Sequence, residues 1–95
     1  MNKAFSPEIP KEEIMALKFH THEVLEDPQA ISIRSYLLRR AHELGNSLKS
    51  KVRIQFLTTD GPREVHTTVW DLTEEFIGLK SGAHIPVRSV LNVSI

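Results

Sequence analysis

The stretch KVRIQFLTTDGPREVHTTVW, residues 51–70, decides the fold class of this chain. From Val52 to Phe56 every second residue is apolar, which is typical of a strand with one buried face. Residues 59–62, TDGP, form a turn signal, because Asp-Gly tolerates positive φ and proline has a preset φ. Apolar or β-branched residues alternate again over residues 64–70. The stretch therefore predicts two antiparallel strands joined by a tight turn.

The residues that follow predict three more short strands. They cover residues 76–80, 83–85 and 90–95, and a single helical turn over 87–89 precedes the last. Pro86 ends the fourth strand, because proline cannot donate to a central ladder. An open sheet of five short strands would expose its edges, and closure removes that cost. We therefore expect a five-stranded antiparallel small β-barrel over residues 47–95.

Upstream of the strands, the spacing of apolar residues changes to that of a helix. Asp27 can cap the first turn, and Pro28 loses no hydrogen bond there. Gly45-Asn46 predicts the helix end, because glycine adopts the left-handed conformation without steric cost. One face of this amphipathic helix carries Ala30, Ile33, Leu37, Ala41 and Leu44.

The first 26 residues are less decisive. Residues 1–10 contain two prolines and few apolar groups, so we expect a loose N-terminal tail. Residues 11–26 fit helical spacing, but Leu17 and Phe19 also alternate as in a strand. Pro10 and the acidic pair Glu12-Glu13 favour a helix start. The expected organisation is a tail, a helical segment over 11–46 and the barrel, all in one α+β domain.

Two resemblances accompany this pattern. The stretch EFIGLKSGAHIPVRSVLNV, residues 75–93, is similar to the closing strands of SH3-like and Sm-like barrels, and an Sm-like fold also has a preceding helix. The run from LLRRAHELGN through TTVW to the IP element resembles a family of short uncharacterised bacterial proteins. That second resemblance implies a domain of unknown function and supplies no activity.

Composition excludes several classes of function. Twelve basic and twelve acidic residues give zero net charge, and the absence of cysteine excludes thiolate chemistry and disulfides. No stretch has the apolar length of a membrane span or the pattern of a signal peptide, so we expect a cytoplasmic protein. Serine, carboxylate and glycine-rich catalytic motifs are missing, and the five histidines match no metal-ligand spacing. We therefore expect a non-catalytic binding or regulatory module without a cofactor.

A basic block in the middle of the chain is the one functional signal. Residues 30–56 hold six basic side chains against one acidic. The candidate site consists of Arg39, Arg40, Lys49, Lys51 and Arg53. If the helix end and the first strand pack side by side, these residues form a positive surface for the phosphates of RNA or single-stranded DNA. The alternative is that they only complement the helix dipole or are solvated.

Two further alternatives stay open. Only Tyr36 or Trp70 could stack on a base, although Trp70 could equally cover the join between helix and barrel. The second functional hypothesis is a protein-interaction or self-assembly module that pairs through exposed strand edges.

Overall fold

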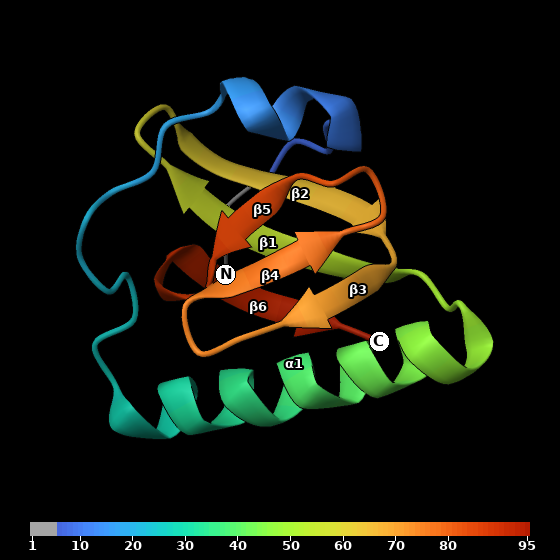
Figure 1. The fold of residues 1–95 in the computed structure, drawn as a ribbon. Helices are drawn as coiled ribbons and strands as arrows, with labels where there is room; N and C mark the ends of the chain where they lie inside the picture. The colour runs from blue at the N-terminus through green and yellow to red at the C-terminus, as the bar shows by residue number, and fades with distance from the viewer. Residues whose placement is uncertain (1–5) are drawn as a thin grey trace.

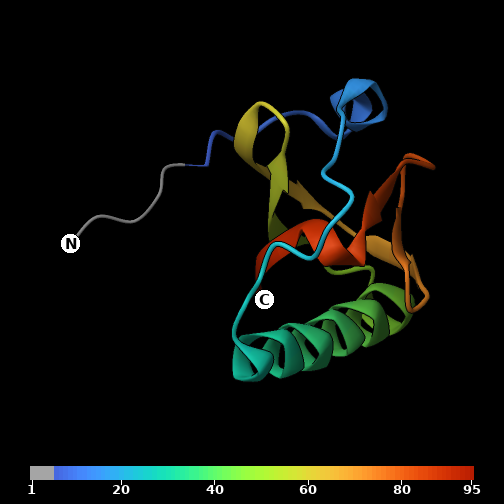
Figure 2. The same ribbon diagram turned by 90° about the vertical axis from the view of Figure 1, so that its left-hand side faces the viewer.

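The computed structural model describes residues 6–95, which form one long helix, two short 3-10 helices and six strands. Their order along the chain is η1 (Lys11–Ala16), α1 (Pro28–Leu48), β1 (Val52–Thr58), β2 (Gly61–Thr67), β3 (Val69–Leu72), β4 (Phe76–Leu79), β5 (His84–Pro86), η2 (Val87–Ser89) and β6 (Val90–Ser94). Figures 1 and 2 show α1 and η1 at opposite ends of the strands. The prediction of an α+β chain in which the helix precedes the strands is confirmed.

The first sheet has the strand order β2-β1-β6, with every pair antiparallel. The turn at Asp60-Gly61 joins β1 to β2, and Gly61 takes the positive φ of 107° that the sequence predicts for this turn. Val52, Ile54 and Phe56 are buried, as their alternation indicates.

The second sheet has the order β3-β4-β5. It begins where the predicted second strand breaks, at Thr68. Thr67, Thr68 and Val69 are buried in succession, so the alternation fails and the chain changes direction. The residues before Thr68 pair with β1, and those after it pair with β4.

The predicted five-stranded SH3-like or Sm-like barrel is therefore wrong. Residues 6–95 contain six strands in two separate three-stranded sheets. The argument for closure assumed that open edges would meet solvent. Instead, α1 packs against β3 and β6, which are edge strands of the two sheets. Along β2, Ile9 N donates to Glu64 O at 2.8 Å and Glu64 N donates to Pro7 O at 2.9 Å.

The predicted helix over residues 11–26 is present only as the short η1. From Leu17 to Glu26 the chain is irregular, and Leu17 and Phe19 pack against the core as their alternation allowed. Phe19 lies 6.0 Å from Phe56 between ring centroids. Of the predicted tail, residues 1–5 lie outside the described part of the chain, and residues 7–9 run beside β2.

Helix α1 starts as the sequence predicts and ends later. Asp27 Oδ1 accepts a hydrogen bond from Gln29 N at 3.0 Å, and Pro28 opens the helix. Gly45 does not end it: α1 continues to Leu48, and Lys49 takes the left-handed conformation with φ 56°. Gly45 is buried against β3, where a Cβ atom would come within 3.0 Å of the carbonyl oxygen of Val69. The glycine therefore serves close packing between the helix and the strand.

The buried face of α1 is also shifted from the predicted one. Arg34, Leu38, Ala41 and Gly45 are buried, whereas Ile33 is 57% exposed. Leu38 and Ala41 join a single core with residues of both sheets, including Ile54, Val69 and Ile77. In residues 6–95, no helix combines the length and apolarity that a bilayer crossing requires.

Candidate nucleic-acid interface

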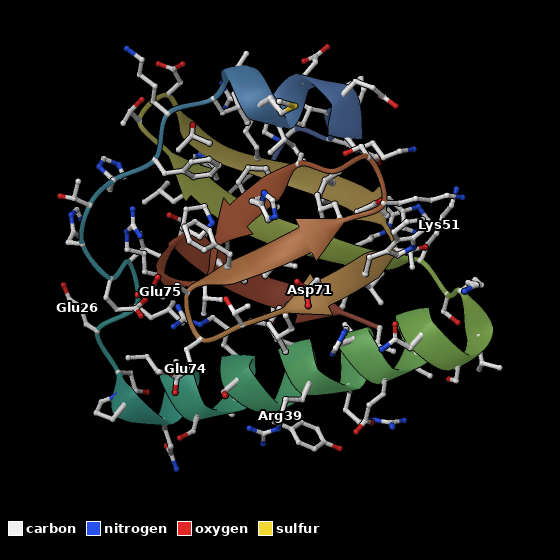
Figure 3. The ribbon with its side chains drawn as sticks, viewed as in Figure 1. Glu26, Arg39, Lys51, Asp71, Glu74 and Glu75 are labelled. Atoms are coloured by element: carbon white, nitrogen blue, oxygen red, sulfur yellow. The ribbon has the colours of Figure 1, made fainter. Side chains whose placement is uncertain are left out.

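The five predicted basic residues do not form one surface. Arg39 and Arg40 lie in the middle of α1, Lys49 follows the helix, and Lys51 lies in the connection to β1. Figure 3 shows Arg39 on the helix and Lys51 far from it, beside the strands. The helix is 21 residues long, so its middle and its C-terminal connection lie many ångströms apart.

Two of these five residues form ion pairs with carboxylates. Arg40 Nη1 lies 2.9 Å from Glu43 Oε1, one helical turn away. Arg53 Nη1 lies 2.9 Å from Glu64 Oε2 and 3.2 Å from Glu8 Oε1. The hydrogen bonds that Arg53 donates to Glu64 and Glu8 raise the pKa of its guanidinium above the ordinary value. These arginines are less available to phosphates than the sequence suggested.

The backbones of three lysines lie instead near Thr68, the residue between the two sheets. Val52 pairs with Thr67 in the first sheet, so Lys51 lies one step further, beside Thr68. Val69 pairs with Leu79 in the second sheet, so Lys80 also lies beside Thr68. The third lysine is Lys49, whose carbonyl oxygen accepts a 3.4 Å hydrogen bond from Thr68 Oγ1.

We call this surface the Thr68 corner and define it by Lys49, Lys51, Thr68, Trp70 and Lys80. All three of its lysines are exposed, and none is in an ion pair with another of the described residues 6–95. The sequence analysis missed Lys80, which lies 27 residues beyond Arg53, outside the basic block. Only the strand registers bring it to this corner.

Trp70 adds an aromatic surface to the corner. It lies where the register of β3 against β4 shifts, between the pairs Val69–Leu79 and Asp71–Gly78. Such an irregularity turns a side chain out of the regular alternation. Trp70 is 50% exposed, and it lines a shallow depression of about 240 Å³ together with Gly45, Asn46 and Lys49. Trp70 and Lys49 therefore border the same hollow.

The histidines form no comparable site. The rings of His20 and His22 lie 5.1 Å apart between centroids. Within residues 6–95, no three histidine, aspartate or glutamate side chains are grouped so that they could hold a metal ion.

Comparison with known proteins adds no assignment. No protein-family model, curated protein or solved structure matches the chain. The resemblance to short bacterial proteins therefore stays a prediction, and function has to be argued from geometry.

Proposed function

We propose that this protein is a non-catalytic binding module that contacts single-stranded nucleic acid, RNA or DNA, at the Thr68 corner. Lys49, Lys51 and Lys80 contact successive phosphates, and a base stacks on Trp70. The observation that carries the proposal is that Lys49 and the half-exposed Trp70 line one hollow, while Lys51 and Lys80, both exposed and without an ion pair among residues 6–95, flank Thr68 in the backbone. Positive charge along a backbone path combined with an aromatic surface is the general chemistry of sequence-tolerant single-strand binding.

Of the five residues predicted from the sequence, Lys49 and Lys51 keep their proposed role. Arg40 and Arg53 contribute less because their carboxylate partners compete with phosphate. Arg39 borders a different surface, described below. The proposal includes a cytoplasmic location, because a chain without cysteine has no disulfide that would need an oxidising compartment.

Strand-edge pairing has less support. Pro7–Ile9 lie along β2, and α1 packs against β3 and β6. The remaining edge strand, β5, is three residues long and contains Pro86, two features that oppose pairing between chains.

Intrinsic fluorescence gives a direct test, because Trp70 is the single tryptophan of the chain. We expect a short oligothymidylate or oligouridylate to quench Trp70 at low salt. Three phosphate contacts on a single strand predict a log–log salt slope of about −2, or a roughly 20-fold loss of affinity over a fourfold rise in salt. The double variant Lys51→Gln/Lys80→Gln should reduce the slope to about −0.7.

Arg40→Gln and Arg53→Gln are the matched controls, since each removes one positive charge that the fold already pairs with a carboxylate. They should weaken binding much less than Lys51→Gln. Absence of quenching at about 50 mM salt, or equal losses in Arg53→Gln and Lys51→Gln, would refute the proposal.

A further inference from the structure

A second surface, separate from the Thr68 corner, carries its own set of charges. It is a groove of about 610 Å³ between α1 and the turn that joins β3 to β4, and η2 forms its end. We call it the helix–turn groove. Figure 3 shows Glu74 above α1 on the turn side and Arg39 on the helix side. A volume of this size falls in the range of small-molecule sites.

Arg34 lines this groove and is the unusual group in it. The side chain is 5% exposed. Its Nη1 and Nη2 donate to the two carboxylate oxygens of Glu23 at 2.6 and 2.7 Å, and Nη1 also donates to Val90 O at 3.1 Å. Its Nε has no acceptor in the described protein. The Nε atom is also closed to solvent, so Arg34 forms a fixed part of the groove wall, and its charge is paired with Glu23.

The exposed charges of the groove lie on opposite sides. Arg39 has no carboxylate within ion-pair distance among residues 6–95 and donates only a long 3.4 Å hydrogen bond to Ser35 Oγ. Glu74 likewise has no cationic partner among those residues. The two side chains therefore offer one positive and one negative contact across the opening.

The turn that carries Glu74 is fixed in place. Thr73 Oγ1 accepts hydrogen bonds from Glu75 N at 3.2 Å and Phe76 N at 2.9 Å. Glu75 O accepts a hydrogen bond from Val87 N at 2.9 Å, which ties the turn to η2. Glu74 is thus presented from a structured backbone.

Four apolar side chains also line the groove, together with Ser35 and Thr73. Leu38 is 2% exposed, and Ile31, Leu72 and Val87 are partly buried. These side chains offer a surface to an aliphatic or aromatic group of a ligand.

We propose that the helix–turn groove binds an apolar α-amino acid. The ligand carboxylate pairs with Arg39, the ammonium group pairs with Glu74, and the side chain lies on Ile31, Leu72 and Val87. A simple carboxylate would be repelled by Glu74 and a simple amine by Arg39. The zwitterion is the class of ligand that satisfies both sides. This proposal does not depend on nucleic-acid binding.

The test is a titration of the full chain followed by backbone amide chemical shifts. L-leucine is the probe, and we expect saturable shifts confined to residues around the groove. N-acetyl-leucine lacks the ammonium group, leucinamide lacks the carboxylate, and glycine lacks the side chain. Each should bind at least about tenfold more weakly, because each loses a charge-assisted contact or the apolar one.

Two variants separate the roles of the charges. Arg39→Gln and Glu74→Gln should each weaken L-leucine, and Glu74→Gln should improve N-acetyl-leucine by removing the repulsion. Arg40→Gln is the control, because Arg40 is paired with Glu43 and does not line the groove. The amide spectrum of each variant reports whether it stays folded.

The proposal is overturned if L-leucine produces no saturable shift up to about 10 mM, ten times a millimolar dissociation constant. It is also overturned if glycine produces the same shifts, or if Glu74→Gln leaves the preference between L-leucine and N-acetyl-leucine unchanged. Loss of oligonucleotide quenching in Lys51→Gln/Lys80→Gln would have no bearing on these outcomes.

Discussion

Gly45→Ala provides the sharpest test of how α1 packs on the second sheet. In an exposed helix position, glycine to alanine stabilises by about 1 kcal/mol, because alanine has the higher helix propensity. At Gly45 the added Cβ would come within 3.0 Å of the Val69 carbonyl oxygen and lie 3.1 Å from the Thr68 methyl group. A backbone carbonyl cannot rotate away, so the helix or β3 must move.

Such a movement loosens the contacts of Leu38 and Ala41, which are 2% and 0% exposed. Overpacking of this kind costs about 1–3 kcal/mol. We expect the strain to outweigh the gain in propensity and to leave Gly45→Ala up to about 2 kcal/mol less stable. In a domain of this size that lowers the melting temperature by about 4–8 °C per kcal/mol.

The assay is urea unfolding followed by Trp70 fluorescence and by circular dichroism. Asn46→Ala is the matched control, because the neighbouring residue is exposed and its replacement adds no atom against β3, removing only a surface hydrogen bond to His42. It should be neutral or slightly stabilising. If Gly45→Ala were as stable as Asn46→Ala, the close approach of α1 to β3 would be refuted.

Two other substitutions test separate parts of the structure. Lys49→Gly should stabilise the fold by up to about 1 kcal/mol, because Lys49 has a φ of 56°, a conformation that glycine adopts without strain. The same substitution should weaken oligonucleotide binding. Urea midpoints measure the first effect and Trp70 quenching the second, and a loss of stability would contradict the left-handed helix end. The hydrogen bonds from Arg34 lower the pKa of Glu23 below its ordinary value of 4.5. The pair therefore stabilises the fold fully above pH 4.5, and this contribution is lost as the pH falls through the lower pKa of the folded state. Glu23→Gln should make the loss of stability between neutral pH and about pH 3 less steep, and an unchanged loss of stability at acid pH would show that the pair contributes nothing.

Local signals in the sequence were sufficient for most elements. The change from helical to alternating spacing places α1 before β1, and Asp27-Pro28 marks the helix start. Asp60-Gly61 marks the first hairpin, and the helical turn predicted over 87–89 is η2. Each of these depends on residues close together in the chain, so a single sequence carries the information.

Other features depend on residues that are far apart in the chain. Ile33 belongs to the predicted apolar face of α1 and Arg34 does not, yet Arg34 is the buried residue, because Glu23 and Val90 hold its guanidinium. From the sequence, Gly45 predicts a helix end, and only the packing of Val69 against it shows that it serves close contact instead. Covering of the strand edges by α1 and residues 7–9 likewise made a closed barrel unnecessary.

The candidate sites show the same division. The sequence by itself determined that basic residues cluster between 30 and 56, and it identified Lys49, Lys51 and Trp70 as candidates for contact with nucleic acid. Only the tertiary structure paired Arg53 with Glu64 and Glu8, brought the backbone of Lys80 near Thr68 and placed Arg39 and Glu74 along one groove. The physical reason is that ion pairing and strand register are set by contacts through space, whereas spacing along one chain reports only on neighbours within a turn or a strand.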